Sequence, residues 1–243
     1  MKQVVLVALV LCGCPKSSEV SPPPSLVGEA KRALAEREKR LTSFKLVVDT
    51  TEGENRAHHE VAFRSPNKSR GHMMAPVDVE LSFDGATLVK LLHAEKKFEV
   101  VSLDMPAADR AYFLASQFMP FVPEGYRAPL LPMVGVKAKK VSLENAEAVE
   151  LRVEPGEGVT VSWVLRLPSG DFLEKRTVDS GRERVLKMER EKCDAVLALC
   201  VPTKLVEMSG EVRVGTTEIT SVELNAVLPQ DYFAPQAPAG WTR

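Results

Sequence analysis

Hydrophobic and polar residues alternate with a period of two along most of this chain, which is the pattern of strands that bury one face of a sheet. The alternation predicts strands near residues 44–49, 60–64, 77–83, 86–92, 98–100, 149–153, 159–167, 172–178, 182–190, 202–208 and 211–228. Asp84-Gly85, between two of these rows, is typical of a hairpin turn. We therefore predict half-buried antiparallel strands joined in a meander.

Two segments have the helical period instead. Ser25 can cap a helix that runs to about residue 41, with Ala30 and Leu34 on its apolar face. A second helix is predicted at residues 107–118, where apolar residues recur at i, i+3, i+4 and i+7. Strands and helices do not alternate, which excludes a parallel doubly wound sheet. The predicted fold class is α+β, one large curved antiparallel sheet with helices on one face.

The stretch from residue 119 to residue 133 is apolar but irregular. Its four prolines exclude a regular helix or a central strand. So many apolar residues on an irregular segment must be shielded from water by packing against another part of the protein. Two interpretations remain open, a loop packed on the core and a mobile lid.

The N-terminus has the order of a secretory signal. A positive start and the apolar run 4–11 precede small and polar residues. The run is far shorter than the ~20 residues that span a bilayer as a helix. Leu11-Cys12-Gly13-Cys14 resembles a bacterial lipobox, which implies a signal peptide at residues 1–13 and Cys14 as the lipidated first residue of the mature chain. The alternatives are a plain signal peptide cut elsewhere and a buried N-terminal strand.

In the lipobox pattern the sulfur of Cys14 carries diacylglycerol, whose acyl chains would together anchor the protein to a membrane, at about 0.8 kcal/mol per buried CH₂. Residues 14–24 would then be the lipidated cysteine and a flexible, proline-rich tether. Pro15 stands where an aspartate retains lipoproteins in the inner membrane of enteric bacteria. This resemblance favours the outer membrane, with the protein facing the periplasm. Residues 25–243 contain no internal repeat or clean linker, so we predict a single domain there.

Composition and motifs narrow the classes of function. The chain has 32 Lys and Arg against 33 Asp and Glu, which gives no support for nucleic-acid binding. It lacks G-x-S-x-G, P-loop and H-E-x-x-H motifs, and Gly156-Glu157-Gly158 leads into a strand instead of a helix. The four histidines, His58, His59, His72 and His93, are interpreted as incidental surface or strand residues. We therefore predict a non-catalytic protein without a cofactor or a metal site.

Cys193 and Cys200 remain after cleavage of the signal peptide. An exported protein enters an oxidising compartment, which favours a disulfide between them. In one continuous helix their Cα atoms would lie about 10 Å apart, too far to bridge. We therefore expect the disulfide to close a turn or a bulge. Free buried thiols are the alternative, and a metal site would need more ligands.

The body of the chain resembles the periplasmic carriers and receptors of the lipoprotein-localisation (Lol) system. After the first helix and two strands, the shared motifs are Arg64-Ser65-Pro66-Asn67, Ser82-Phe83-Asp84-Gly85-Ala86-Thr87-Leu88, and the closing segment Leu228-Pro229-Gln230-Asp231-Tyr232-Phe233 with Pro238-Ala239-Gly240. The resemblance implies an incomplete antiparallel β-barrel, with helices that cover its concave face and an apolar cavity for acyl chains.

The chain departs from that family at three points. Ser65 stands where the soluble carriers have an arginine that helps to latch the lid, and Arg64 lies one residue earlier. A shift of one residue on a strand turns a side chain to the other face. Val89 replaces the family's aromatic residue after the hairpin. The soluble carriers are not lipidated, so an anchored chain is more similar to a membrane receptor or a lipid-binding lipoprotein.

The resemblance and the one-sided apolar rows predict a lipid-anchored protein that holds acyl chains of lipoproteins or lipids for transfer within the envelope. A periplasmic carrier protein is a candidate partner. The predicted ligand-binding residues are Phe44, Leu46, Val48, Val61, Phe63, Val79, Leu81, Phe83, Leu114, Phe118, Val161, Trp163 and Leu165. The alternative is a structural or sensory envelope lipoprotein whose core is filled by its own side chains. The discriminating observation is whether the concave face is open or packed.

Overall fold

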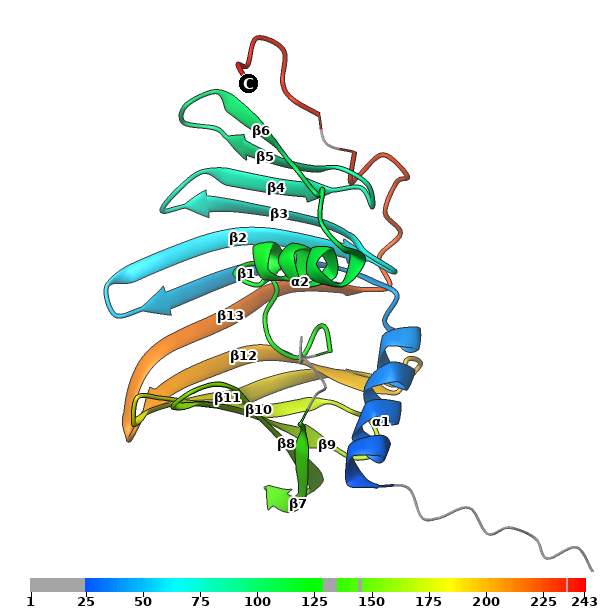
Figure 1. Ribbon diagram of the computed structural model, residues 1–243, viewed down its shortest axis with the longest axis vertical. Coiled ribbons are helices and arrows are strands. Elements are labelled where there is room, and N and C mark those ends of the chain that lie inside the picture. The colour runs from blue at the N-terminus through cyan, green and yellow to red at the C-terminus, as the bar shows by residue number, and fades with distance from the viewer. Residues whose placement is uncertain (1–24, 129–134, 144–145, 235) are drawn as a thin grey trace, which may run out of the picture.

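The computed structural model describes residues 25–128, 135–143, 146–234 and 236–243, and within these ranges thirteen strands form one antiparallel sheet (Figure 1). The first half of the chain forms β1 (Ser43–Glu52), β2 (Asn55–Arg64), β3 (Lys68–Ala75), β4 (Val79–Phe83), β5 (Leu88–Leu92) and β6 (Lys97–Val101). The second half forms β7 (Lys137–Leu143), β8 (Ala146–Gly156), β9 (Val159–Arg166), β10 (Phe172–Asp179), β11 (Arg182–Asp194), β12 (Leu199–Ser209) and β13 (Val212–Leu224). Helix α1 spans Leu26–Arg40 and helix α2 spans Ala107–Phe118. The predicted α+β class is confirmed.

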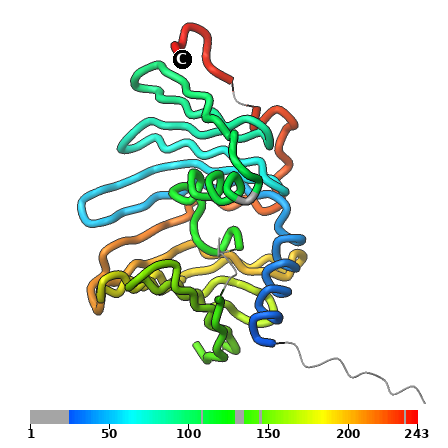
Figure 2. Tube along the Cα trace, viewed as in Figure 1, coloured from blue at the N-terminus to red at the C-terminus, as the bar shows by residue number. Residues whose placement is uncertain are grey.

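The sheet consists of two meanders that meet in its middle. Its strand order is β6-β5-β4-β3-β2-β1-β13-β12-β11-β10-β9-β8-β7. The two halves join where Phe44 of β1 pairs with Leu224 of β13. After β6 the chain must cross from one edge of the sheet to the other before β7 can begin. This crossover carries α2 and the segment after it over the central strands (Figure 2).

The sheet curves around the face that carries both helices, and it stays open because β6 and β7 form two separate edges (Figure 1). Register shifts occur in several strand pairs, for example between Val47 and Val48 where β1 meets β13. Such bulges bend a strand and increase its twist. The result is the incomplete barrel that the sequence predicts.

Helix α1 begins at the expected cap, since the Ser25 hydroxyl accepts a hydrogen bond from the Gly28 amide at 3.2 Å. Ala30 and Leu34 are buried on its inner face, as the periodicity predicts, and the helix contacts β7 and β8. Arg37 lies on that same face and is also buried. A charged residue on the apolar face was not expected, and its partners lie in distant parts of the chain.

The core divides into two clusters on the concave face. The cluster nearer α2 is built on Phe44, Leu46 and Val48 of β1, together with residues of β2 and β4. The cluster beneath α1 is built on Val149 and Leu151 of β8, together with residues of β9 and β12. The strand residues of both clusters therefore occupy inward positions of the period-two rows.

Two strands were not predicted from the alternation. β3 carries Gly71 between polar residues, and its place is set by pairing with β2 and β4. β7 reads KAKKVSL, so it lacks a run of apolar residues. It is an edge strand, and lysines on such a strand oppose pairing with another chain.

Neither helix of the described residues is long and apolar enough to cross a membrane. The predicted signal peptide (1–13) and the tether (14–24) with Cys14 lie outside the described residues. So do residues 129–134, which belong to the irregular stretch after α2.

Candidate functional site

A cavity of about 470 Å³, partly open to solvent, lies between α2 and the concave face, with lining residues from both halves of the sheet. It is lined by Pro66, Asn67, Ser69, Phe83, Gly85, Ala107, Arg110, Ala111, Leu114, Ala115, Phe118, Met119, Val122, Pro123, Glu124, Arg127, Ala128, Trp163 and Lys175. Its volume is within the range of roughly 300–1,000 Å³ that is usual for small-molecule pockets. The concave face is thus neither wholly open nor wholly filled.

One face of α2 forms the outer wall of this cavity. Ala107, Ala111, Leu114, Ala115 and Phe118 share that face because they follow helical spacing. Phe118 is buried at the C-terminal end of the helix, whereas Ala111 is exposed and Leu114 is half-buried. The N-cap residue supplies no side-chain hydrogen bond. The helix is therefore held to the sheet mainly at its C-terminal end.

The segment after α2, residues 119–128, packs onto the sheet and forms the inner wall. Phe121 is 4% exposed, and its ring lies so close to Gly71 of β3 that a Cβ there would come within 2.6 Å of it. His59 contributes a second contact, with its Nε2 3.0 Å from the Phe121 carbonyl oxygen. For residues 119–128 the loop packed on the core is the interpretation that the structure supports.

A second set of contacts fixes the far end of this segment. Tyr126 is 2% exposed and donates its hydroxyl proton to the Pro202 carbonyl oxygen at 2.7 Å. Gly125 has a φ of +89°, and a Cβ there would lie 2.8–2.9 Å from Pro202 and Phe172. Only glycine combines that backbone conformation with so close an approach. Both ends of the segment 119–128 are thus docked on the sheet. Helix α2 is the less tightly packed part of the cover over the cavity.

Charged groups gather where the cavity meets solvent. Lys175 pairs with Glu124 at 2.6 Å, and its ammonium lies 5.6 Å from the centre of the Trp163 ring. Arg110 and Arg127 line the same cavity, so positive side chains outnumber negative ones among its lining residues. The cavity thus combines an apolar wall with a cationic rim.

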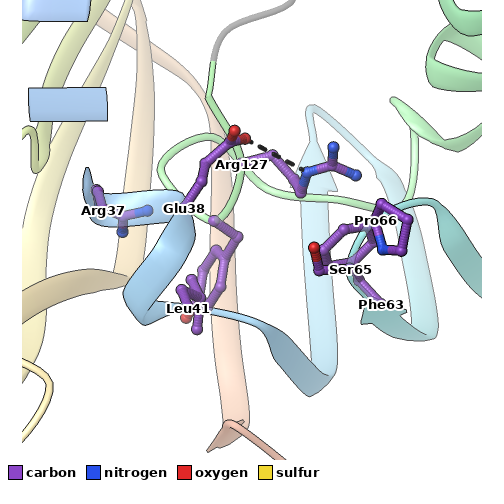
Figure 3. A pocket seen from close by; sticks show the side chains of 8 residues that line it. Arg37, Glu38, Leu41, Phe63, Ser65, Pro66 and Arg127 are labelled. Atoms are coloured by element: carbon purple, nitrogen blue, oxygen red, sulfur yellow. Dashed lines mark ion pairs between the residues drawn. The ribbon is translucent and has the colours of Figure 1, made fainter. Parts of the chain in front are cut away.

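Arg127 also connects the cavity with a small pocket of about 50 Å³ between α1 and β2 (Figure 3). Its guanidinium carbon lies 3.9 Å from the centre of the Phe63 ring, and its Nε is 3.9 Å from Glu38 of α1. The pocket is lined by Arg37, Glu38, Leu41, Phe63, Ser65, Pro66, Tyr126 and Arg127. Burial lowers the pKa of Arg127, and the negative charge of Glu38 opposes this effect.

Arg64 lies on the convex face of the sheet, away from the cavity, as the one-residue shift predicts. It donates to the Leu228 carbonyl oxygen at 3.1 Å and lies over the ring of Phe233. The arginine beside Ser65 and Pro66 on the concave face is instead Arg127, from the segment after α2. The arginine next to the β2–β3 turn therefore comes from the segment after α2, and not from β2 itself.

The structure divides the predicted ligand-binding residues into three groups. Phe83, Leu114, Phe118 and Trp163 line the cavity. Phe63 lines the small pocket. The remaining predicted residues lie outside these linings: Phe44, Leu46, Val48, Val61, Leu81 and Leu165 are buried in the core, and Val79 and Val161 are half-buried. The inward rows are thus mostly packed by the protein's own side chains.

Several lining residues were not identified from the sequence. Met119, Val122 and Pro123 belong to the irregular stretch whose role was left open, and Lys175 is a single charge on an inward-facing strand position. For α2 the signal was present, because the predicted helical face already carried Ala111 and Ala115 beside Leu114. Small residues on the inner face of a covering helix leave space beneath it.

Cys193 and Cys200 are joined by a disulfide, at directly paired positions of β11 and β12. The turn between them is closed by Asp194, whose carboxylate accepts from the amides of Val196 and Leu197 at 2.9 Å each. The bridge lies at the end of the hairpin that packs against α1. The Cys200 carbonyl oxygen accepts a hydrogen bond from Arg37 at 3.2 Å.

Comparisons with known proteins show the fold. No protein-family model matches the chain, and no curated protein matches it. A LolA superfamily protein from Nitrosomonas europaea aligns with a TM-score of 0.52 and 13% identity, covering 85% of this chain and 97% of that one. A putative outer membrane lipoprotein-sorting protein domain from Vibrio parahaemolyticus aligns with a TM-score of 0.53 and 12% identity, covering 84% and 97%. The chain therefore has a LolA-like fold.

Proposed function

We propose that this chain, which has the LolA-like fold, is a lipid-anchored envelope protein that binds acyl chains of lipoproteins or lipids beneath α2. The protein makes and breaks no covalent bond in this role. An acyl chain leaves for whichever partner binds it more tightly, so transfer follows differences in affinity. A periplasmic carrier protein would deliver or receive the chain.

The observation that carries this proposal is the cavity of about 470 Å³ beneath the inner face of α2. Ala111, Leu114 and Ala115 offer an apolar wall, and each methylene buried there contributes about 0.8 kcal/mol. Arg110 and Arg127 at the rim would attract an anionic headgroup while the chain lies inside. The fold supports the proposal, since two solved structures with the same fold are described as a LolA superfamily protein and a lipoprotein-sorting domain.

The anchor is the second part of the proposal. The lipobox-like motif that ends in Cys14 supports a diacylglycerol anchor on the first residue of the mature chain, and Pro15, which stands where an aspartate would retain the protein in the inner membrane, favours the outer membrane. Metabolic labelling with a radioactive fatty acid tests this part separately. We expect label on the wild-type chain and none on the Cys14→Ser variant. Equal labelling of the two chains would contradict the lipobox assignment.

Native mass spectrometry tests the binding function. The chain from Ser17 onward, exported to a bacterial periplasm, is expected to carry the mass of a phospholipid or an acylated peptide. A chain that is free of ligand should then take up added fatty acid, with a change in the emission of Trp163 in a Trp241→Phe variant. A ligand-free mass without uptake of added lipid would contradict the proposal.

A second function is favoured by the packed part of the concave face. The rings of Phe44 and Phe63 lie 5.5 Å apart, so two residues expected to touch a ligand contact one another instead. Under this alternative the protein is a structural or sensory envelope lipoprotein that contacts another protein. The same measurement decides between the two, because only the first predicts uptake of lipid.

A further inference from the structure

Two of the four histidines meet on the convex face of the sheet. Ser69 lines the cavity and Gly71 lies against Phe121, so these positions of β3 face inward. The alternate residues Arg70 and His72 therefore face outward. His72 comes from β3, Asp78 from the turn before β4, and His93 from the turn after β5. No sequence motif indicated this cluster, because adjacent strands bring its members together.

The register of the strands fixes these three residues beside one another. His72 pairs with Glu80 across β3 and β4. The backbone amide of His93 donates to the Asp78 carbonyl oxygen at 3.1 Å, which ties the two turns together. The C-terminal segment covers one side, since the Trp241 ring packs edge-on against His93 with 5.1 Å between the ring centres. The cluster is thus held by backbone pairing and packing.

The side chains converge on one point. His72 Nε2 lies 2.8 Å from Asp78 Oδ1, and one ligand atom from each of His72, Asp78 and His93 lies within 4.8 Å of the others. The two imidazole rings stack with their centres 4.9 Å apart. His93 Nε2 is buried and has no hydrogen-bond partner. A buried ring nitrogen without a partner is costly, and a metal ion would provide one.

The carboxylate of Glu80 completes the surroundings. It pairs with Arg70 at 2.8 Å, and its other oxygen lies 3.8 Å from His93 Nε2. Glu80 therefore adds negative charge beside the same ring nitrogen of His93 that lacks a hydrogen-bond partner. The three ligand side chains are 27–46% exposed, which leaves access for an ion and for water as a further ligand.

We infer that His72, Asp78 and His93 form a binding site for one divalent transition-metal ion of the zinc class. Two imidazole nitrogens and one carboxylate oxygen are ligands that zinc accepts, with a fourth position for water. Calcium and magnesium are disfavoured because they require mainly oxygen ligands. Ligand atoms around tetrahedral zinc lie about 3.3 Å from one another, which follows from bonds of ~2.0–2.1 Å. Small rotations of the side chains therefore complete the site.

The test uses the full chain, purified in detergent through a tag without histidine and stripped of metal with a chelator. Zn²⁺ is titrated in competition with a chromogenic chelator, and Co²⁺ is added separately to record its visible absorption. We expect one Zn²⁺ per chain and a Co²⁺ spectrum of low coordination number. His72→Ala and His93→Gln should each weaken Zn²⁺ binding by at least about tenfold, since loss of even an outer-shell partner costs roughly 10–100-fold.

His58→Ala is the matched control, because His58 also pairs with a carboxylate, that of Asp49, at 2.7 Å, whereas its neighbour His59 faces the other side of the sheet. This variant should bind Zn²⁺ like the wild-type chain. Thermal melting without metal shows whether the His72 and His93 variants are folded, and bound Zn²⁺ should raise the melting temperature only of chains that retain the site. Absence of stoichiometric binding would overturn the inference. So would full affinity in the His72→Ala and His93→Gln variants, or an equal loss in the control.

Discussion

Arg37 and Asp171 form a buried ion pair, with Arg37 Nε 3.4 Å from Asp171 Oδ1 and side chains that are 3% and 4% exposed. Arg37 also donates to the carbonyl oxygens of Gly125 and Cys200. Asp171 in turn accepts from the Cys200 amide at 3.1 Å. The pair therefore connects α1 with the inner wall of the cavity and with β12. Burial lowers the pKa of Arg37, and the charge of Asp171 opposes this effect.

Replacing Arg37 with methionine should destabilise the protein by up to about 3–5 kcal/mol, because the buried Asp171 would keep only Arg166, 3.6 Å away, as a charged partner. The free energy of unfolding in urea measures the effect. Lys39→Met is the control on the same helix, since Lys39 and its partner Glu36 are 70% and 63% exposed. That change should stay within about 0.5 kcal/mol. The double variant Arg37→Met/Asp171→Leu should recover part of the loss. Equal effects of Arg37→Met and Lys39→Met would contradict a stabilising role of the buried pair.

His59 should make the stability depend on pH. Burial lowers the pKa of His59 below its ordinary value of 6.5, and the hydrogen bond to Phe121 opposes this only in part. Its Nδ1 is buried without a partner, so a proton there would be unsatisfied. At pH values between the pKa of His59 in the folded chain and its pKa in the unfolded chain, the unfolded chain binds more protons. The stabilisation from neutral His59 is therefore present above the unfolded pKa and falls as pH decreases towards the folded pKa.

Urea unfolding at a series of pH values from about 7.5 to about 5 measures this effect. The free energy of unfolding should decrease over that interval in the wild-type chain and decrease less in a His59→Gln variant. His58→Gln provides a comparison, because the adjacent His58 has a side chain that is 42% exposed. A slope that is the same in the wild-type and the His59→Gln chains would exclude His59 as its cause.

The period-two rows predicted which face of each strand is buried, but not what covers it. Val61 and Phe63 lie on the inner face, as the rows predict, and at 2% and 5% exposed they are packed into the core. The cover comes from residues 119–128, whose path depends on a glycine at position 71 of a strand that the pattern missed. Arg37 could not be identified from α1, since its partner Asp171 is 134 residues away.

The helical signal carried more information about the cavity than the strands did. The i, i+4, i+7 face of α2 is the wall itself, and its alanines are the reason that space remains beneath it. The C-terminal motif was also informative, because Phe233 is fully buried and its carbonyl oxygen accepts from Ser82 at 2.9 Å. The hairpin motif and the closing motif thus meet in the folded chain, although the two residues lie 151 positions apart in the sequence.

The disulfide should contribute to stability through the hairpin that it closes. Cys193 and Cys200 are seven residues apart, and a loop of that size corresponds to about 2–3 kcal/mol in the chain-entropy account. A Cys193→Ser/Cys200→Ser variant should lose about this much in urea unfolding. Adding a reductant should destabilise the wild-type chain similarly and leave the variant unchanged. If the reductant affected both chains equally, its action would not involve this bridge.

Filling the cavity from α2 should block the proposed ligand without unfolding the protein. Ala115 lines the cavity on the inner face of the helix and is half-buried, so Ala115→Trp would place an indole in the space beneath it. Displacing only two methylenes of an acyl chain costs about 1.6 kcal/mol, which is roughly a tenfold loss of affinity. Competition with a fluorescent fatty acid measures the change.

Tyr112→Trp is the matched control, because Tyr112 lies on the same helix but is 64% exposed and does not line the cavity. It adds the same indole to the outer face of α2 and should leave binding unchanged. Unaltered affinity in Ala115→Trp, with both variants melting like the wild-type chain, would place the ligand elsewhere. A loss of affinity in Ala115→Trp alone would place the acyl chain against α2, since only that variant carries an indole on the inner face of the helix.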